Sequence, residues 1–233
     1  MFEKGLVPSR SRAEAYIMEG RVTVGGAVAA KPGLFVSPSA DIKVKESDEF
    51  VSRGGFKLKR AFDEFSVDVK GLVCMDAGAS TGGFTDCLLR EGAKKVYCVD
   101  VGYGILDAKI KNDPRVVNFE KTNVRYFDRS LLKDEIDFAV VDVSFISLEK
   151  VLPAVKNIVE RGAGVIALVK PQFEAPRGST KRGVVRDEAV RSAAIEKVRR
   201  FASGIGFEII GGTDSPIKGP KGNLEYLLYM KSA

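Results

Sequence analysis

Four ionisable residues occupy positions from which they could take part in acid–base chemistry: Lys57, Asp142, Lys170 and Glu225. Asp142 and Lys170 each end a run of mostly apolar residues with the composition of a buried β-strand. Because the carboxyl ends of parallel strands meet at one edge of a sheet, these two side chains should face the same crevice. The chain contains no histidine, so a proton in that crevice has to be moved by Lys, Asp, Glu or Tyr.

Lys57 and Glu225 are predicted to join them from the elements that cover and close the sheet. Lys57 lies at the start of a helix expected at 56–65, and Glu225 opens the last strand. Considered singly, both are explained better by a solvated surface position. Asp142 alone is compatible with a helix cap, and Lys170 alone with a structural ion pair. The convergence of two ammonium groups and two carboxylates is what favours a functional site.

A glycine-rich loop, DAGASTGGFT at 76–85, follows the first strand of this sheet. Glycines let a ligand approach the backbone, and the helix expected at 82–91 offers unpaired amides at its N-terminus. The spacing differs from the Gly-x-Gly-x-x-Gly of nicotinamide sites, and no Gly-Lys-Ser/Thr of a triphosphate-binding loop follows. Asp100 ends the next strand, where a carboxylate can bind a ribose hydroxyl pair. The pattern predicts an adenosine-containing ligand and resembles the S-adenosylmethionine loop of Rossmann-like methyltransferases.

The residues expected to hold this cofactor lie in the loop and at the ends of neighbouring strands. They are Asp76, Gly78, Ser80, Thr81, Gly82, Gly83, Phe84, Asp100, Asn123 and Asp142. Asn123 follows the third strand and is assigned to the edge of the adenine ring by analogy alone.

From residue 56 onward, strand and helix patterns alternate as in a doubly wound domain. Strands are expected at 72–76, 95–100, 115–119, 136–142, 163–169, 206–212 and 224–230, and helices at 82–91, 105–111, 148–160 and 187–203. Only a loop at 213–223 separates the last two strands, which should therefore pair antiparallel. The expected fold class is α/β: a Rossmann-like, S-adenosylmethionine-dependent methyltransferase with a seven-stranded, mostly parallel sheet.

Residues 1–48 are expected to form a small α+β domain, joined by a linker at 49–55 to a methyltransferase domain at 56–233. Ser9 can cap a helix that ends at Gly20. Short strands are expected after it, at 21–24, 27–30 and 42–45.

This domain resembles the C-terminal part of the RNA-binding module named after ribosomal protein S4. The matching stretches are SRSRAEA at 9–15, GRVTV at 20–24 and VAAKP at 28–32. The opening helix of the module normally begins several residues earlier, so the first residues of the module are expected to be missing.

Basic residues in two segments are candidates for contacts with RNA phosphates. Those of the S4-like domain are Arg10, Arg12, Arg21 and Lys31. Those of the segment 172–186, which follows Lys170, are Arg177, Lys181 and Arg182. The alternatives are a basic cap with no role in RNA binding and an ordinary solvated lid.

In order and local sequence, the four ionisable residues match the Lys-Asp-Lys-Glu tetrad of the ribose 2′-O-methyltransferases related to FtsJ. Longer stretches resemble the TlyA family, whose members are described both as haemolysins and as ribosomal RNA 2′-O-methyltransferases. These stretches are the 76–85 loop, DVGYG at 100–104, NDPRV at 112–116, SFISL at 144–148, VKPQFE at 169–174 and GNLEY at 222–226. The resemblance implies methyl transfer from S-adenosylmethionine to a ribose hydroxyl, with ribosomal RNA or a ribosomal subunit as partner and no metal.

The tetrad suits this reaction because a ribose hydroxyl is a poor nucleophile at neutral pH. A lysine that is desolvated and close to a second cation can have its pKa lowered, which would let Lys170 accept the hydroxyl proton. Asp142 and Glu225 would orient the lysines and balance their charge. Lys57 would steer the acceptor nucleotide.

Composition limits the alternatives. The 37 basic and 31 acidic residues give a net charge of +6, which suits a polyanionic partner and equally an ordinary solvated surface. No apolar run approaches the roughly 20 residues of a membrane span, and no secretory signal opens the chain. The three cysteines are expected to be buried, in a reducing compartment. We therefore expect a cytoplasmic protein with no membrane partner.

Three other functions stay open at this level. A non-catalytic RNA-binding or ribosome-assembly protein could retain the sheet, and a small-molecule methyltransferase would leave the basic N-terminal domain without a role. Membrane lysis, the third, is disfavoured because the sequence has no long amphipathic helix with a wide apolar face.

Overall fold

The computed structural model describes residues 1–29, 31–45, 49–176, 178–219 and 221–233. A small N-terminal unit contains α1 (Arg10–Met18), β1 (Val22–Val24), β2 (Ala27–Val28) and β3 (Ile42–Val44). The larger domain contains the strands β4 (Val73–Ala77), β5 (Lys95–Val99), β6 (Val116–Phe119), β7 (Ile136–Val141), β8 (Val159–Val169), β9 (Phe207–Asp214) and β10 (Tyr226–Ser232). Its helices are α2 (Gly54–Phe65), α3 (Gly83–Arg90), α4 (Ala108–Lys111), α5 (Leu152–Ile158), α6 (Pro171–Glu174) and α7 (Glu188–Gly204), with 3-10 turns η1 (Val124–Tyr126), η2 (Arg129–Leu131) and η3 (Leu148–Lys150).

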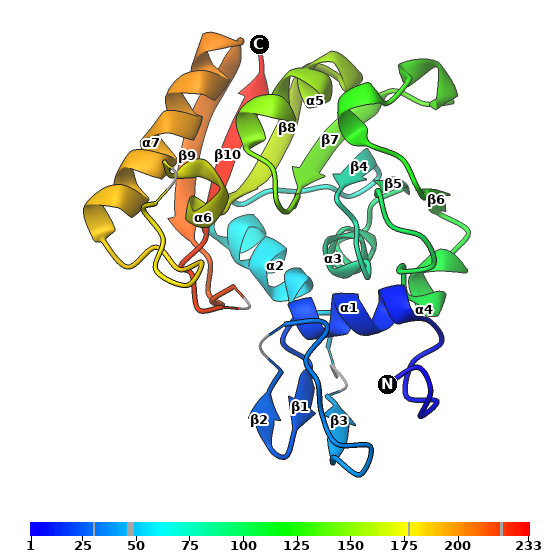
Figure 1. Ribbon diagram of the computed structural model, residues 1–233. Helices are drawn as coiled ribbons and strands as arrows, with labels where there is room; N and C mark the ends of the chain where they lie inside the picture. Colours follow the sequence, from blue (N-terminus) through cyan, green and yellow to red (C-terminus); the bar gives the residue numbers. More distant parts are fainter. Residues whose placement is uncertain (30, 46–48, 177, 220) are drawn as a thin grey trace.

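The seven strands of the larger domain form one sheet in the order β6-β5-β4-β7-β8-β10-β9 (Figure 1). All neighbours pair in parallel except β10, which runs antiparallel to both β8 and β9. The predicted α/β fold with a mostly parallel sheet and a closing hairpin is confirmed. The strand order reverses between β4 and β7, and in such sheets ligands bind in the crevice outside the carboxyl ends of the strands at that point.

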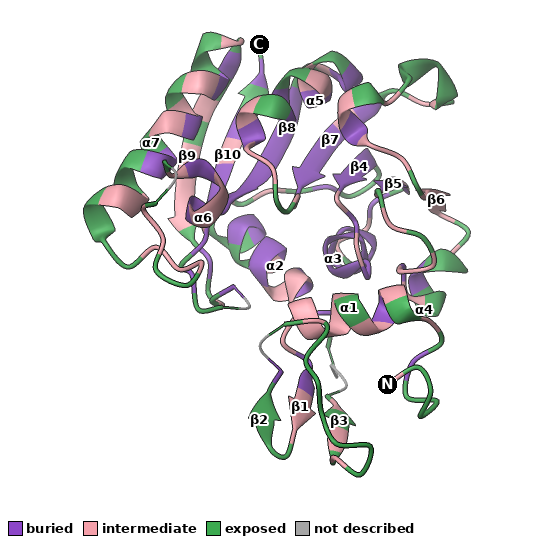
Figure 2. Cartoon of the chain, viewed as in Figure 1, coloured by how far each residue is buried: buried purple, intermediate pink, exposed green. Residues whose placement is uncertain are grey.

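Each face of the sheet is covered by its own helices, which leaves the central strands buried on both sides (Figure 2). Alternate residues of a strand therefore enter different cores. Met75 of β4 packs in the core under α5 and α7, whereas its neighbour Cys74 packs in the core under α2 and α3. All three cysteines are buried with free thiols, as the sequence predicts.

Some predicted helix boundaries are wrong where proline interrupts the pattern, and others differ without a proline, as in α4, which begins at Ala108 and not at 105. The helix expected at 148–160 is divided into η3 and α5, and Pro153 lies in the first turn of α5, where its missing N–H is not needed. Strand β8 begins at Val159, four residues before the predicted start. Pro171 likewise begins a one-turn helix, α6, that the sequence pattern did not predict.

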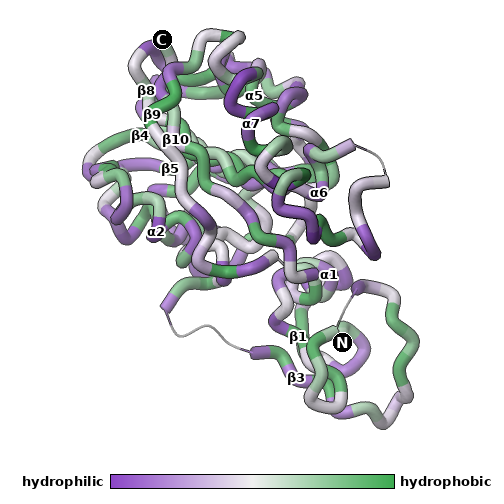
Figure 3. The backbone as a smooth tube through the Cα atoms, turned by 90° about the vertical axis from the view of Figure 1, so that its left-hand side faces the viewer, coloured by the Kyte–Doolittle hydropathy of each residue, from purple (hydrophilic) through white to green (hydrophobic). Residues whose placement is uncertain are grey.

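The N-terminal unit is a helix followed by a three-stranded antiparallel sheet in the order β2-β1-β3. The Ser9 side chain caps α1 by accepting a hydrogen bond of 3.0 Å from the amide of Arg12. The small sheet is set apart from the larger domain, and α1 lies between the two (Figures 1 and 3). Helix α2 begins at Gly54, so it includes the last two residues of the predicted linker.

Candidate active site

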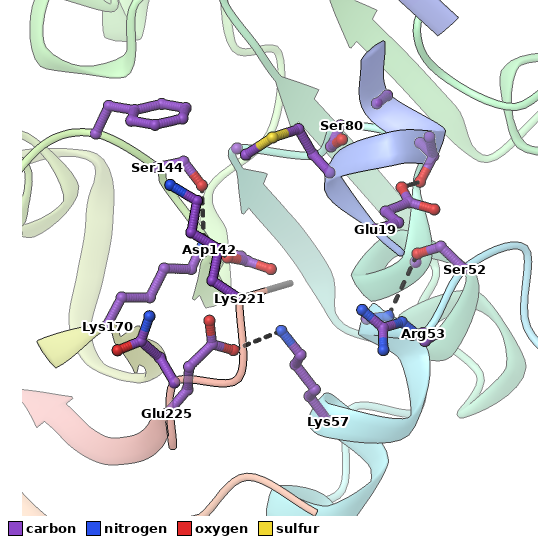
Figure 4. Close-up of a pocket in the computed structure, with 18 of the residues that line it drawn as sticks. Glu19, Ser52, Arg53, Lys57, Ser80, Asp142, Ser144, Lys170, Lys221 and Glu225 are labelled. Atoms are coloured by element: carbon purple, nitrogen blue, oxygen red, sulfur yellow. Dashed lines mark hydrogen bonds and ion pairs between the residues drawn. The ribbon is translucent and has the colours of Figure 1, made fainter. Parts of the chain in front are cut away.

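A cavity of about 410 Å³ opens at the carboxyl ends of β4, β7 and β8. Its walls come from the end of α1, the start of α2, the glycine loop and the segments that follow β7 and β8 and precede β10 (Figure 4). This volume lies within the range of pockets that enclose a small-molecule ligand. All four residues of the predicted tetrad line it: Lys57, Asp142, Lys170 and Glu225.

The tetrad forms two lysine–carboxylate pairs. Lys57 donates to Glu225 over 2.6 Å, and the Lys170 Nζ lies 2.5 Å from Asp142 Oδ1 and 2.9 Å from Ser144 Oγ. The Glu225 side chain is 1% exposed, whereas that of Asp142 is 21% exposed. The carboxylate of the first pair is therefore closed to solvent and that of the second is partly open, whereas the two lysine side chains are about equally exposed, at 10% and 11%.

The charges of the tetrad act on one another across the cavity. Burial favours the neutral form of Asp142, but the Lys170 and Lys57 ammonium groups outweigh it and hold the pKa of Asp142 below its ordinary value. Asp142 is thus a stable anion that keeps a cation beside it. Such a pair can position Lys170 toward a substrate group in the cavity.

The glycine loop is held tightly against the end of β7. A side chain at Gly78, where φ is +91°, would bring a Cβ within 2.5 Å of the carbonyl oxygen of Asp142. The amide of Asp142 in turn donates to Ala77 over 2.9 Å. Glycine at position 78 therefore allows the loop and the tetrad carboxylate to share one wall of the cavity.

Asp76 lies beneath the loop and is completely buried. It accepts a hydrogen bond of 2.6 Å from the Thr85 hydroxyl through Oδ2, while Oδ1 has no hydrogen-bond partner among the described residues. Burial, together with the nearby Asp142 and Asp100 charges, raises the pKa of Asp76 to about 7. Asp76 supports the loop from below and is not part of the cavity wall.

The predicted cofactor residues separate into two groups. Gly78, Ser80, Thr81, Gly83, Phe84 and Asp142 line the cavity, whereas Asp76, Gly82, Asp100 and Asn123 are not part of its wall. Asp100 accepts hydrogen bonds from the amides of Ser80 (2.8 Å) and Gly102 (2.7 Å), which fixes the loop to the end of β5. Asn123 caps η1 by accepting from the Arg125 amide over 3.1 Å. In the structure, the side chains of Asp100 and Asn123 thus both bind nearby backbone amides.

The basic residues of the N-terminal unit also separate into two groups. The Arg12 guanidinium is buried and donates to the Ile105 carbonyl and to Asp107 of the larger domain. Arg21 is buried as well and donates to the carbonyls of Lys45 (3.0 Å) and Val51 (2.8 Å). Both guanidinium groups form hydrogen bonds within the chain. Since they are also buried, they leave no surface at which an RNA phosphate could bind.

Arg10 and Lys31 of the N-terminal unit are exposed, as are Lys181 and Arg182 of the segment 172–186. Arg177, which was predicted to accompany them, lies outside the described residues. The predicted RNA contacts therefore rest on these four exposed cations.

Other residues of the site had no clear signal in the sequence. Phe145 is 76% exposed, adopts φ +64°, and places its ring 5.2 Å from that of Phe173, so two aromatic rings meet at the rim of the cavity. Asn223 joins the segment before β10 to residues 183–185 through hydrogen bonds of 2.9 Å in both directions. Lys221 lies beside it in the cavity wall. The quoted stretches SFISL and GNLEY contain Phe145 and Asn223, but neither pattern shows which way a side chain points.

Comparisons with known proteins agree with this geometry. Residues 50–232 match the model of the FtsJ-like methyltransferase family, and residues 1–42 match that of the S4 domain. The chain belongs to the FtsJ-like methyltransferase family. Within it, the chain is 42% identical to hemolysin A of Brachyspira hyodysenteriae, over 97% of this chain and 95% of that protein. It is also 42% identical to the Mycobacterium tuberculosis 16S/23S rRNA (cytidine-2′-O)-methyltransferase TlyA, over 100% of this chain and 88% of that protein.

Solved structures of other proteins share the fold of this FtsJ-like chain. A Streptococcus thermophilus protein solved under the name hemolysin superposes with a TM-score of 0.79 and 41% identity, over 100% of this chain and 86% of that one. The N-methyltransferase NodS of Bradyrhizobium japonicum, solved with S-adenosyl-L-homocysteine, shares the fold alone, with a TM-score of 0.54 and 12% identity over 76% of this chain and 87% of NodS. In the described part of this FtsJ-like chain, no helix has the length and apolar character needed to cross a membrane.

Proposed function

We propose that this protein transfers a methyl group from S-adenosylmethionine to a ribose 2′-hydroxyl of ribosomal RNA. The observation that carries the proposal is the position of the Lys170–Asp142 pair beside the glycine loop, in one cavity. The Mycobacterium tuberculosis relative is named for the same reaction, on cytidine of 16S and 23S rRNA. A ribosomal substrate would place the reaction in the cytoplasm.

The cavity suits the methyl donor in both size and chemistry. Gly78, Ser80 and Thr81 present backbone and hydroxyl groups to it, and Gly83 lies at the N-terminus of α3. Glu19 lines the same cavity, and its Oε2 is buried without a hydrogen-bond partner among the described residues. When bound, S-adenosylmethionine supplies a methyl group on a positively charged sulfur, which is an electrophile for an oxygen nucleophile.

The chain's own residues would prepare that oxygen. As the ribose oxygen forms its bond to the methyl carbon, its proton passes to the Lys170 Nζ, for which the amine has to be neutral at the moment of transfer. Asp142 and Ser144 hold the nitrogen in place and stabilise the ammonium that results. Lys57 and Glu225 keep the opposite wall rigid and charged, so that the acceptor enters in one orientation.

The surface around the cavity suits RNA. The Phe145 and Phe173 rings offer a stacking surface for a base that has left its helix, which is how single-stranded RNA is commonly bound. Lys181, Arg182 and Lys221 are exposed near the same opening, and Arg10 and Lys31 extend the positive charge onto the N-terminal unit. A free nucleoside would make no use of these cations.

Methyl transfer from radiolabelled S-adenosylmethionine to purified ribosomal subunits tests the proposal. Label should appear in RNA and survive alkaline hydrolysis in a dinucleotide, because a 2′-O-methyl group blocks cleavage of the adjacent phosphodiester. The Lys170→Ala variant should give no label. Label that is released as a mononucleotide would indicate base methylation instead, and RNA binding without label would indicate the non-catalytic alternative.

A further inference from the structure

The C-terminal end of α1 forms part of the cavity wall, although α1 belongs to the N-terminal unit. Glu19, at the C-cap of α1, accepts a hydrogen bond from the hydroxyl of Thr81 in the glycine loop. Its second oxygen, Oε2, is buried and has no hydrogen-bond partner within the described residues. The nearest charge to Oε2 is Arg21 Nη1 at 3.7 Å, beyond hydrogen-bond range. One carboxylate oxygen of this cavity-lining residue thus has unused hydrogen-bonding capacity.

Arg53 lies on the same side of the cavity, at the N-cap of α2 (Figure 4). Its Nε is buried without a partner, and its guanidinium makes no ion pair or hydrogen bond with any residue that the structure describes. A side chain at Gly20 would come within 3.1 Å of Arg53 Nη2, so the glycine that follows Glu19 leaves room for the guanidinium. Arg53 is therefore a half-buried cation held beside the loop without an anion of its own.

These two groups carry opposite charges but do not pair with each other in the described structure, where they are more than 4.0 Å apart. The amino-acid end of S-adenosylmethionine carries the complementary charges, an ammonium and a carboxylate on one carbon. An arginine fork binds a carboxylate well, and a carboxylate oxygen with free lone pairs accepts from an ammonium.

We infer that Glu19 accepts a hydrogen bond from the ammonium group of the methyl donor and that Arg53 binds its carboxylate. This inference rests on the proposed function, since it names the groups that recognise its cofactor. It means that the N-terminal unit contributes a cofactor-recognising group directly. Burial raises the pKa of Glu19 above its ordinary value, against the opposing effects of the Thr81 hydrogen bond and of Arg21, Arg12 and Arg53. A further cation, hydrogen-bonded directly to Oε2, would offset that cost.

Binding of three adenosyl ligands, measured by calorimetry on the full chain, tests the inference without reliance on turnover. S-adenosylhomocysteine carries both charged groups, decarboxylated S-adenosylmethionine lacks the carboxylate, and 5′-methylthioadenosine lacks the whole amino-acid end. Loss of one charge-assisted hydrogen bond should weaken binding by about 10- to 100-fold. We expect Glu19→Gln to weaken the first two ligands by this factor and to leave the third unchanged.

Arg53→Gln should weaken S-adenosylhomocysteine alone, because the other two ligands have no carboxylate. Glu14→Gln, an exposed acid on the same helix, is the matched control and should change nothing. Weakening of 5′-methylthioadenosine as much as of S-adenosylhomocysteine would overturn the inference, because Glu19 would then only support the fold. Unchanged or tighter binding of S-adenosylhomocysteine by both variants would overturn it too. If the unaltered protein bound none of the three ligands, the proposed function itself would fail.

Discussion

The two lysine–carboxylate pairs of the cavity have nearly the same length and different surroundings. Lys57 and Glu225 are both almost completely buried, and their contact joins α2 to the segment before β10. In the other pair, Lys170 is buried to a similar extent, but Asp142 is 21% exposed and Ser144 shares the lysine. All four side chains line the cavity, but the carboxylate of the first pair is closed to solvent and that of the second is partly open.

This difference indicates different roles for the two lysines, although their side chains are chemically identical. A buried ion pair is costly to disrupt, because removal of one partner leaves the other charge without compensation. A pair whose carboxylate is partly open leaves room for a ligand group beside its lysine. We therefore expect stability to depend on the Lys57–Glu225 pair and the rate of the reaction to depend on Lys170.

The largest effect should come from the removal of Lys170, the lysine of the partly open pair. Lys170→Met should lower the rate of methyl transfer by about 10²- to 10⁴-fold, the usual contribution of a general base. The affinity for S-adenosylhomocysteine should change little, because Lys170 is assigned to the acceptor. Single-turnover kinetics and calorimetry measure the two quantities. A rate within a few-fold of that of the unaltered protein would contradict the assignment of proton transfer to Lys170.

The next effect concerns stability. Glu225→Ala leaves the Lys57 ammonium buried and unpaired, which should lower the free energy of unfolding by about 3–5 kcal/mol. The double variant Lys57→Met/Glu225→Leu, which removes both charges, should recover most of that loss. Urea unfolding measures both. Asp142→Ala serves as the comparison and should cost less, since the Lys170 ammonium that it leaves keeps its hydrogen bond to Ser144 and water can enter the partly open space of the removed carboxylate. Equal losses would contradict the assignment of the two pairs.

A third test compares two carboxylates, one beside the lysines and one beneath them. The pKa of Asp76 is raised to about 7, so its contribution to stability is fully present below the unfolded value of 3.8 and is lost as pH rises through 7. The shift corresponds to at most about 4 kcal/mol. Asp76→Asn should therefore become more stable relative to the unaltered protein between pH 5 and pH 8. Asp142, whose pKa is lowered, contributes stability above pH 3.8 that is lost only as pH falls below it.

Urea unfolding at several pH values gives the difference between Asp76→Asn and the unaltered protein. A difference that does not change with pH would show that Asp76 titrates normally. Asp142→Asn provides the control of opposite sign, with its loss of stability greatest near neutral pH.

The smallest effect concerns the exposed cations near the open pair. Lys181→Gln/Arg182→Gln should weaken RNA binding only a few-fold at moderate salt. It should also reduce the slope of log affinity against log salt by about 0.7 for each phosphate that the variant no longer neutralises. Lys70→Gln, an exposed lysine before β4 at the opposite edge of the sheet, should leave the slope unchanged. If both variants gave the same slope, the segment 172–186 would not contact the RNA.

Much of the fold could be predicted from the sequence because its strands are continuous apolar runs that end in polar residues. The same runs placed Asp142 and Lys170 at the correct edge of the sheet, because the carboxyl ends of its parallel strands all lie at that edge. Where proline interrupts a pattern, as at Pro153 and Pro171, the predicted boundaries were displaced. The one-turn helix α6 is too short to have a hydrophobic period of its own.

The parts of the site that could not be predicted depend on how the two domains pack. Sequence shows that Arg12 is basic, but not that its guanidinium reaches the Ile105 carbonyl and Asp107 of the other domain. It likewise gives no reason to connect Glu19 with Thr81, 62 residues away. A charge on a short helix that has no distinct apolar face can face water or a partner, and only the tertiary packing decides which.

The antiparallel direction of β10 has a consequence for the order of events during synthesis. Because β10 runs against its neighbours, its first residues lie at the edge where the other strands end, and this brings Glu225 to Lys57. The two residues are separated by 168 positions, so the ribosome has to make all of the chain between them before the ion pair can form. A growing chain therefore holds the glycine loop and three members of the tetrad but not the fourth. The candidate site is therefore completed only after the segment before β10 has emerged.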